Sequence, residues 1–247
     1  MEADSIQTQA YLEKSYWWFL GRRRIIETVL HKFFSKKGLQ ILDWGCGAGG
    51  NHGLLESYGV VTGVDSSDEA LKFCREKGIT NLVKAGTVDE FVSSTPASSF
   101  DLVTAFDVLE HIPQDREYLK DLHKVLKPGG YVLITVPAFQ FLWSELDDRV
   151  GHQRRYTRAG LSDKLEDAGF TPVKASYFIS SMFLPILVYR FLGKITGRSR
   201  TPKFTYVEFP RPINWLLTEL IYFESALLQK INLPFGSSFI ILARRKT

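Results

Sequence analysis

The chain has 247 residues, of which 45% are hydrophobic and 23% are charged, a composition typical of a folded globular protein and not of a disordered chain. The net charge of +4 is mild and no nucleic-acid motif is present, so nucleic acid is not an expected partner. No apolar run is long enough to span a bilayer, the N-terminus lacks the apolar core of a signal peptide, and the two cysteines, Cys46 and Cys74, favour a reducing cytosol.

Residues 1–40 are predicted to be helical. An aromatic run from Tyr16 to Phe19 precedes three arginines, and Ile25, Val29 and Phe33 then recur every fourth residue, as a buried helical face requires. Two interpretations follow. Either the helix packs on the core with its arginines exposed, or it forms a lid whose aromatic face meets a cationic cofactor.

A glycine-rich turn follows a short apolar strand within residues 41–51. Strand, turn and helix together form a nucleotide cradle, because glycine lets a ligand approach the backbone and the helix offers free N–H groups. The spacing of Gly45, Gly47 and Gly50 also fits nicotinamide-binding folds. Asp43 is more specific, since a carboxylate there repels a pyrophosphate but can hold an ammonium group. The alternative is an ordinary turn in which Asp43 caps a neighbouring group.

A second strand is predicted at residues 60–64 and ends at Asp65, about twenty residues after the first glycine. Doubly wound folds place an acid at this distance to bind the ribose hydroxyls. Residues 66–69 have the spacing of a capping box, which puts Asp65 just before a helix. The alternative is a solvated turn aspartate. A third short strand is predicted at residues 81–85.

The fourth strand is predicted at residues 99–106 and is followed by Asp107 and the sequence Val-Leu-Glu-His. A helix then runs to the stop signal Lys-Pro-Gly-Gly at residues 127–130, and a fifth strand covers residues 131–136. His111 is a candidate base, although a histidine so close to a helix start is as often a structural hydrogen-bonding residue. Strands that alternate with helices predict a parallel sheet with helices on both faces.

The glycine turn with its following strand, the stretch from Phe100 to His111 and the stop signal at residues 126–130 resemble the motifs of class I S-adenosylmethionine (SAM)-dependent methyltransferases, of the type 11/12-like group. The resemblance covers about residues 39–180, and the aromatic–arginine opening resembles a subgroup of these enzymes. Many members carry an acid after the third strand that meets the adenine amino group, but Thr87 occupies that position here, with Asp89 and Glu90 slightly later. This leaves open which side chain reads adenine, and Val88 N–H is a candidate partner for the ring. The cofactor-binding residues that the resemblance implies are Asp43, Gly45, Cys46, Gly47, Asp65, Ser66, Thr87, Val88, Phe106 and Asp107.

The loop at residues 143–157 resembles the acceptor-side loop of methyltransferases of glycan and quinone biosynthesis. Here His152 could take a proton from an acceptor hydroxyl, and Arg154 or Arg155 could hold an anionic group. A salt-bridged surface loop is the alternative. The catalytic candidates are His152, His111 and Tyr156, and no metal site is predicted.

More than fifty residues separate the sixth strand, at residues 170–179, from the closing strand at 237–243, so this connection should fold and have a function. It contains an apolar run at residues 182–189 and six basic residues against one acid between Ser180 and Pro212. A helical pattern at residues 213–232 carries an apolar stripe with polar residues opposite. We expect this insertion to face a membrane or a lipid-linked acceptor; packing on the domain or a homodimer interface is the alternative. The stripe is Leu216, Leu220, Phe223, Leu227 and Ile231, and Thr218, Ser225, Gln229 and Asn232 lie opposite.

The sequence therefore predicts an α/β fold with a doubly wound, seven-stranded, mostly parallel Rossmann-like sheet, an N-terminal helix and a helical insertion before the last strand. The predicted function is methyl transfer from SAM, with S-adenosyl-L-homocysteine as product, to a small-molecule, glycan or lipid-linked acceptor at oxygen, in the cytoplasm or peripheral to the inner face of a membrane. The alternatives are a catalytically silent SAM-binding protein and a nicotinamide-dependent oxidoreductase. The expected parts are a lid at residues 1–38, the SAM-binding domain at 39–179, the insertion at 180–235 and the closing strand at 236–247.

Overall fold

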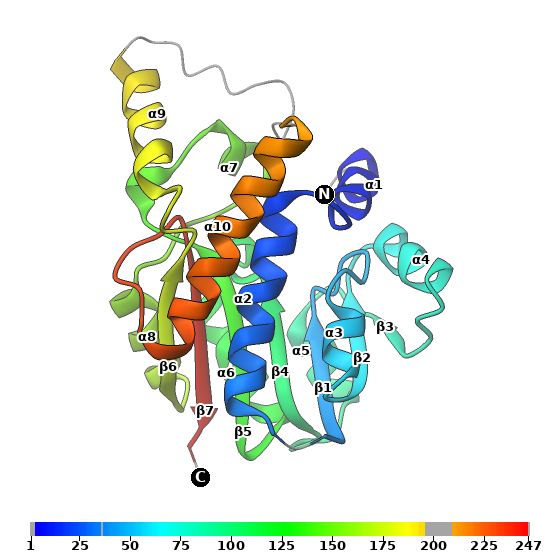
Figure 1. Ribbon diagram of the computed structural model, residues 1–247. Coiled ribbons are helices and arrows are strands. Elements are labelled where there is room, and N and C mark those ends of the chain that lie inside the picture. The colour runs from blue at the N-terminus through cyan, green and yellow to red at the C-terminus, as the bar shows by residue number, and fades with distance from the viewer. Residues whose placement is uncertain (1–2, 36, 196–208, 247) are drawn as a thin grey trace.

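The computed structural model describes residues 3–35, 37–195 and 209–246, and seven strands of this part form one sheet (Figure 1). The strand bounds agree with the predicted ones to within a few residues, except that β5 begins before the glycine pair at 129–130 and not after it. The strands are β1 (Leu39–Trp44), β2 (Gly59–Asp65), β3 (Leu82–Lys84), β4 (Phe100–Phe106), β5 (Leu126–Pro137), β6 (Phe170–Phe178) and β7 (Ser238–Arg245).

Helices connect and cover these strands. The α-helices are α1 (Ala3–Leu12), α2 (Trp17–Phe33), α3 (His52–Glu56), α4 (Asp68–Glu76), α5 (Val88–Ser94), α6 (Asp115–Val125), α7 (Glu145–Val150), α8 (Arg158–Asp167), α9 (Phe183–Ile195) and α10 (Arg211–Lys230), and two short 3₁₀ helices are η1 (Leu109–His111) and η2 (Gln140–Leu142).

The strand order is β3-β2-β1-β4-β5-β7-β6, with β7 antiparallel to both of its neighbours and the other adjacent strands parallel. The order reverses between β1 and β4, and at such a point the loops after both strands leave a crevice at the carboxyl edge of the sheet. The doubly wound fold predicted from the sequence is confirmed, and the insertion lies between β6 and β7 as expected.

Two apolar cores lie on opposite faces of the sheet. Side chains alternate along β4, so that Val103 and Ala105 pack with α5, α6 and α8, whereas Leu102 and Phe106 pack with α2, α3 and α10. Strands buried on both faces read as continuous apolar runs, which explains the run at residues 102–106. The sheet is therefore a rigid platform for the loops at its carboxyl edge.

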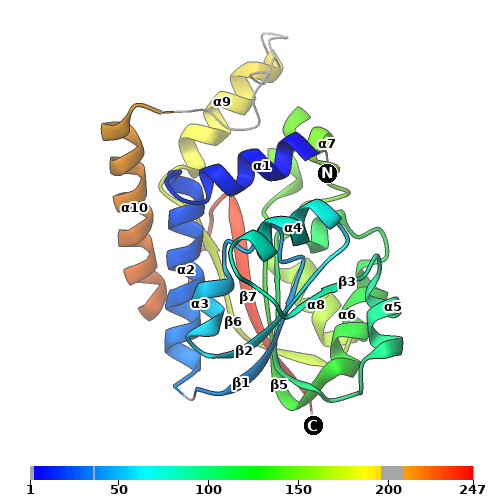
Figure 2. The same cartoon turned by 90° about the vertical axis from the view of Figure 1, so that its right-hand side faces the viewer.

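The N-terminal region is two helices and not one, because the chain turns at residues 13–16. Ile6 and Ala10 of α1 pack with Ala48 of the glycine turn and with α4, and Figure 2 shows α1 above α4 at one end of the sheet. The aromatic run, in contrast, packs mostly into the core, where Tyr16, Trp17 and Phe19 are buried. The helix that covers the glycine turn is thus α1, and the expectation of an aromatic lid face is corrected.

Helix α10 lies beside α2 (Figure 1) and buries a mixed face, with the apolar Ile221 and Leu228 and the polar Thr218, Glu224 and Ser225. Gly21 permits this contact, since a Cβ there would lie 2.7 Å from Ile221 Cγ2. The buried Glu224 carboxylate accepts hydrogen bonds from the N–H groups of Ser180 and Ser181. Polar groups buried with partners fix the helix as firmly as apolar ones.

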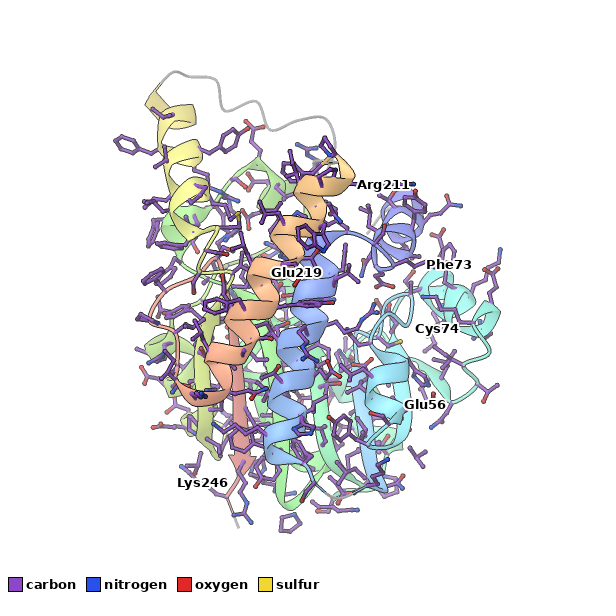
Figure 3. The ribbon with its side chains drawn as sticks, in the orientation of Figure 1. Glu56, Phe73, Cys74, Arg211, Glu219 and Lys246 are labelled. Carbon is purple, nitrogen blue, oxygen red and sulfur yellow. The ribbon has the colours of Figure 1, made fainter. Side chains whose placement is uncertain are left out.

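The apolar stripe of α10 consequently faces solvent. Leu216, Phe223 and Ile231 are 52%, 65% and 54% exposed. Figure 3 marks the course of this helix with Arg211 in its first turn and Glu219 further along. Packing on the domain therefore involves Thr218 and Ser225 opposite the stripe, whereas Leu220 and Leu227 of the stripe are only partly covered.

Candidate functional site

The glycine turn after β1 depends on backbone angles that only glycine adopts easily. Gly45 and Gly47 have φ of +71° and +55°. A Cβ on Gly45 would lie 2.4 Å from Val108 Cγ2, whereas a Cβ on Gly47 would meet only Gln9 Nε2, at 3.6 Å. The turn is therefore packed tightly against the loop after β4 on one side and leaves backbone accessible to a ligand at Gly47.

Asp65 stands at the carboxyl end of β2, as predicted, and holds this turn in place. Its Oδ2 accepts the N–H of Gly47 at 2.9 Å and its Oδ1 accepts the N–H of Ser67 at 2.9 Å. Ser67, and not Ser66, is the N-cap of α4, and Ser66 is exposed at the same turn. A half-buried carboxylate beside a glycine backbone can accept hydrogen bonds from a pair of ribose hydroxyls, which is the role that the sequence predicts for Asp65.

Asp43 is buried at the end of β1, and its Oδ1 accepts a 2.7 Å hydrogen bond from Thr104 Oγ1 of the neighbouring strand β4. Burial raises the pKa of this carboxyl to about 7, although the Thr104 bond and the positive charge of Arg22 oppose the rise. A carboxyl in this condition gains stabilisation from a cation. The residues at this edge thus fit the amino-acid part of SAM, whose ammonium group would supply that charge.

The other predicted cofactor residues lie around the same edge but differ in burial and in whether their side chains already have hydrogen-bond partners. Cys46 is buried beside Gly63, and Phe106 is buried in the core below the loop. Thr87 is exposed, but its Oγ1 caps α5 by accepting the N–H of Glu90, and the Val88 side chain packs into the core. Which group would contact the adenine ring stays a prediction.

Asp107 has a left-handed backbone with φ of +56° and forms a buried ion pair with Arg22 of α2. The guanidinium carbon of Arg22 also lies 4.8 Å from the centre of the Trp18 ring. The arginines of α2 were expected on its exposed face. This is wrong for Arg22, because the Asp107 carboxylate stabilises it at the carboxyl edge of β4, and Arg22 joins the site as a residue that the sequence analysis missed.

His152 of the predicted acceptor loop is oriented by a buried carboxylate. Its Nδ1 lies 2.8 Å from Asp147 Oδ1, and Arg155 holds the same acid with bonds of 2.7 and 3.0 Å. Burial alone would raise the pKa of Asp147, but the bonds from His152 and Arg155 outweigh burial and hold the pKa below its usual range. The ionised Asp147 can only accept, so Nδ1 of His152 carries a proton, and in the neutral ring the lone pair is on Nε2.

Glu110 and His111 lie next to this histidine. His152 Nε2 is 3.8 Å from Glu110 Oε1, and the rings of His111 and His152 are 4.8 Å apart. The Glu110 side chain is fully buried, and burial together with the nearby Asp107 raises the pKa of its carboxyl well above the usual value. The structure thus brings both predicted histidines together and adds Glu110, which the sequence analysis did not single out.

Tyr156, Arg154 and Arg155 have structural partners. The Tyr156 hydroxyl is buried and donates to Asp115 Oδ2 at 2.9 Å, and Arg154 pairs with the same carboxylate at 2.8 Å. Burial and the Asp115 charge raise the pKa of Tyr156, which makes it a poor acid or base. The expectation that Arg154 or Arg155 is available to an anionic acceptor is corrected, since each already binds a carboxylate, and the geometry favours a packing role for Tyr156.

Arg190 of α9 enters the site from the insertion. Its side chain is mostly buried, its Nη1 is 3.7 Å from Asp147 Oδ2, and that nitrogen has no hydrogen-bond partner in the described residues. Burial and the charge of Arg155 lower the pKa of Arg190 to about 10. The sequence analysis placed Arg190 in a basic row with Lys194 and Arg198. This is corrected for Arg190, while the Lys194 side chain and Arg198 lie outside the described residues.

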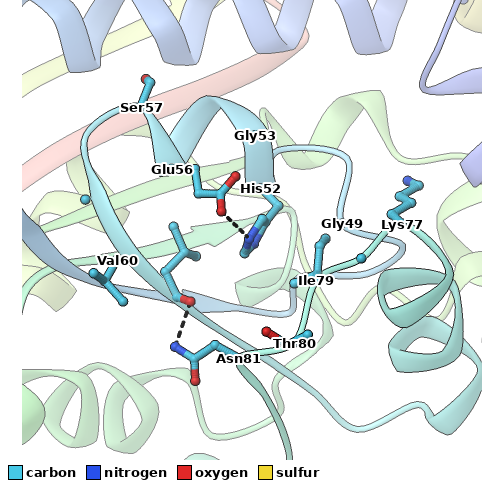
Figure 4. Close-up of a pocket in the computed structure, with 13 residues that line it drawn as sticks. Gly49, His52, Gly53, Glu56, Ser57, Val60, Lys77, Ile79, Thr80 and Asn81 are labelled. Carbon is cyan, nitrogen blue, oxygen red and sulfur yellow. Dashed lines mark hydrogen bonds and ion pairs between the residues drawn. The ribbon is translucent and has the colours of Figure 1, made fainter.

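A surface groove of about 800 Å³ lies elsewhere, between α3 and the loop before β3 (Figure 4). His52 and Glu56 approach each other at 3.7 Å on one wall, and Asn81 Nδ2 donates to the Val61 carbonyl on the other. It contains neither Asp43, Asp65 nor His152. The groove therefore adjoins the glycine turn at Gly49 but does not reach the acidic and histidine side chains described above.

Comparison with known proteins identifies the family. A family model described as a methyltransferase domain matches residues 18–175. The chain is 32% identical over 166 residues to phosphoethanolamine N-methyltransferase 1 of Arabidopsis thaliana, a match that covers 63% of this chain and 33% of the relative. It is 34% identical over 119 residues to a ubiquinone biosynthesis O-methyltransferase of Idiomarina loihiensis, covering 46% of this chain and 47% of the relative.

Among solved structures, a SAM-dependent methyltransferase from Archaeoglobus fulgidus shares the fold with a TM-score of 0.58 at 23% identity, over 90% of this chain and 94% of that one. The chain belongs to the methyltransferase-domain family, within the class I SAM-dependent methyltransferases. The predicted family and its cofactor are thereby confirmed, and the nicotinamide alternative is removed. The chain spans between a third and a half of the length of the curated relatives named above.

Proposed function

We propose that this chain transfers the methyl group of SAM to a hydroxyl oxygen of its acceptor. The observation that carries the proposal is the His152–Asp147 pair, which presents a basic Nε2 beside the loop after β4. When bound, SAM supplies an electrophilic methyl group. A neutral hydroxyl is a weak nucleophile and gains from losing its proton during transfer, whereas a neutral amine needs no such help.

In this reaction the chain's own residues orient the reactants and move one proton. His152 Nε2 takes the hydroxyl proton while Asp147 stabilises the resulting imidazolium. The oxygen bonds to the methyl carbon, the carbon–sulfur bond breaks with its electron pair going to sulfur, and the products are a methyl ether, S-adenosylhomocysteine and one proton. Glu110 and Leu109 are buried behind the loop and exclude water from the inner side of the carboxyl edge of the sheet.

The relatives include both oxygen and nitrogen methyltransferases, so the acceptor atom needs a direct test. We would supply methyl-labelled SAM with catechol-type phenols and, separately, with phosphoethanolamine. Labelled methyl ether from the phenols is the expected result, and His152→Ala should lower turnover at least tenfold while SAM affinity stays near that of the wild type. Label in the amine alone would overturn the proposal, and no label in either would favour a silent SAM-binding protein.

We further propose that the acceptor is lipid-linked and that the apolar stripe of α10 meets an anionic bilayer surface, with the chain otherwise in the cytoplasm. The stripe residues Leu216, Phe223 and Ile231 are exposed, and Arg211 and Lys230 stand at the two ends of the helix. Such a helix suits the headgroup region, where each cation adds about 1 kcal/mol. No helix in the described part of the chain is long and apolar enough to cross a membrane.

Sedimentation with vesicles tests this surface. The wild type should sediment with anionic vesicles at low salt, and the double variant Leu216→Ser and Phe223→Ser should stay in the supernatant. Val173→Ser, which changes an exposed apolar residue on β6, is the matched control and should sediment. Recovery of the wild type in the supernatant with both anionic and neutral lipid would reject the membrane surface. A wild-type dimer that the double variant converts to monomer would assign the stripe to a second copy.

A further inference from the structure

Glu110, His111 and His152 form a cluster that the reaction above uses only in part. Glu110 and His111 belong to η1 after β4, and His152 comes from the loop after α7. The backbone joins the two loops, since Gln153 N–H donates to the Glu110 carbonyl at 2.7 Å. One ligand atom from each side chain, a carboxylate oxygen and two ring nitrogens, lies within 4.8 Å of the other two. Three donors at this spacing can close around one ion by small side-chain rotations.

The carboxylate of this cluster lacks the partners that a buried acid needs. Glu110 is 0% exposed, and neither of its oxygens has a hydrogen-bond partner among the described residues. Leaving a buried polar group unsatisfied costs about 1–3 kcal/mol, and more for a charged group. A bound cation within reach of both oxygens would remove this cost. The Glu110 carboxylate therefore points to a ligand.

Both histidines have hydrogen-bond partners that orient their rings, as histidine ligands of metal ions usually have. Asp147 accepts the proton of His152 Nδ1, which turns the lone pair of Nε2 toward Glu110 at 3.8 Å. This carboxylate–histidine arrangement fixes the tautomer and the ring orientation at metal sites. The His111 ring has a hydrogen-bond partner in the backbone of Gly151, which leaves its other ring nitrogen for an ion.

Most of the positive charges around the cluster have acid partners. Arg22 pairs with Asp107 and Arg155 pairs with Asp147, while Arg190 Nη1 approaches the same Asp147 at 3.7 Å without a hydrogen bond. The acid of the cluster itself is Glu110. A divalent ion would thus meet one carboxylate oxygen and two ring nitrogens.

We propose that Glu110, His111 and His152 bind a divalent transition-metal ion of the zinc type. Two nitrogens and one oxygen suit zinc and its neighbours, whereas magnesium and calcium prefer oxygen donors throughout. Three protein ligands leave at least one position open for a further oxygen. This departs from the sequence expectation, which assigned no metal site.

The evidence for the metal site is independent of the proposed function, but the effect of the ion on methyl transfer rests on that function. An ion here would bind the acceptor oxygen and lower the pKa of the coordinated hydroxyl. With the ion bound, His152 Nε2 would be a ligand and would no longer act as the base, and the hydroxyl proton would pass to solvent. Binding of the ion itself is independent of any acceptor. Metal binding and methyl transfer can therefore be tested separately.

The test is calorimetric titration of the chelator-treated full chain with zinc ion alone, supported by the visible spectrum of the cobalt-loaded protein. We expect one ion per chain and a cobalt spectrum typical of low coordination number. Glu110→Gln and His152→Ala should each weaken zinc binding at least about a hundredfold, because loss of a ligand exceeds the roughly 10–100-fold effect of losing a supporting residue. His31→Ala, at an exposed histidine of α2, is the control and should bind as the wild type does.

Absence of zinc binding by the folded wild type would overturn the proposal, as would equal affinity in wild type, Glu110→Gln and His152→Ala. Circular dichroism checks folding, and His111→Ala replaces any variant that does not fold. If zinc binds but phenols are not methylated, the metal site stands and the oxygen acceptor falls. If phenols are methylated without zinc binding, His152 acts as the base and the metal proposal falls.

Discussion

The glycine-turn edge, proposed for the cofactor (the cofactor edge), and the His152 edge, proposed for the acceptor (the acceptor edge), lie side by side but are built on different principles. At the cofactor edge the backbone of residues 45–50 makes the site, and Asp65 fixes it through two bonds to N–H groups nearby. At the acceptor edge, buried charges make the site, with Asp147 bound by His152, Arg155 and Arg190 from two different segments. A backbone site is damaged by added volume, whereas a charged site is damaged by a lost partner.

The largest expected effect comes from volume at the cofactor edge. Gly45→Val places a branched side chain against Val108 and at φ of +71°, a conformation that costs about 1–3 kcal/mol for such a residue. SAM binding measured by calorimetry should become undetectable. Gly53→Ala is the control, since a Cβ there meets nothing within 4 Å and the variant should bind normally. Normal SAM binding by Gly45→Val would show that added volume does not damage the backbone site, and the distinction between the two edges would be wrong.

Loss of a partner at the acceptor edge should act on stability instead. Asp147→Ala leaves Arg155 and Arg190 buried without their acid, and breaking a buried pair in this way costs about 3–5 kcal/mol. Denaturant unfolding should show this loss, and the folded fraction should retain SAM affinity. Asp163→Ala, at an exposed position on α8, should change stability little. A stable Asp147→Ala with weak SAM binding would assign this network to the cofactor.

Asp65→Ala tests the side chain that supports the backbone site. It removes the acceptor for the ribose hydroxyls and frees Gly47 N–H, which should weaken SAM binding about ten- to a hundredfold, or about 1.5–3 kcal/mol. Asp68→Ala is the matched control, because Asp68 is exposed and pairs only with Lys84 in the described residues. Unchanged affinity in Asp65→Ala would remove this assignment.

The smallest effect is a dependence of SAM affinity on pH through Asp43. Its pKa of about 7 means that the free protein is increasingly protonated there as the pH falls below 7, whereas an ammonium ligand favours the ionised form and a lower pKa. Binding should therefore weaken by up to about tenfold per pH unit below 7 and level off above it. Asp43→Asn should flatten this profile, and a pH-independent wild type would show that Asp43 does not meet the ammonium group.

Much of the cofactor edge was predictable because its determinants are local. Gly45, Gly47 and Asp65 belong to a continuous strand–turn–helix–strand segment in which positive φ angles require glycine and alternation marks the strands. The acceptor edge was predictable only as a cluster of polar residues around His152. Asp147, the partner of Arg155, lies in the same loop, but Asp115, the partner of Arg154 and Tyr156, lies about forty residues away and was not predictable as their partner.

The sequence by itself determined the succession of strands and helices along the chain, the glycine turn and the methyltransferase family, because each follows from short motifs or from periodicity along one element. Only the tertiary structure decided which charges meet and which face of α10 is buried. Arg22 and Asp107 are 85 residues apart, and Glu110 meets His152 from a separate loop. A helical period defines two faces of α10 but does not say which one packs, and Glu224 settled it by accepting the backbone N–H groups of Ser180 and Ser181 across the fold.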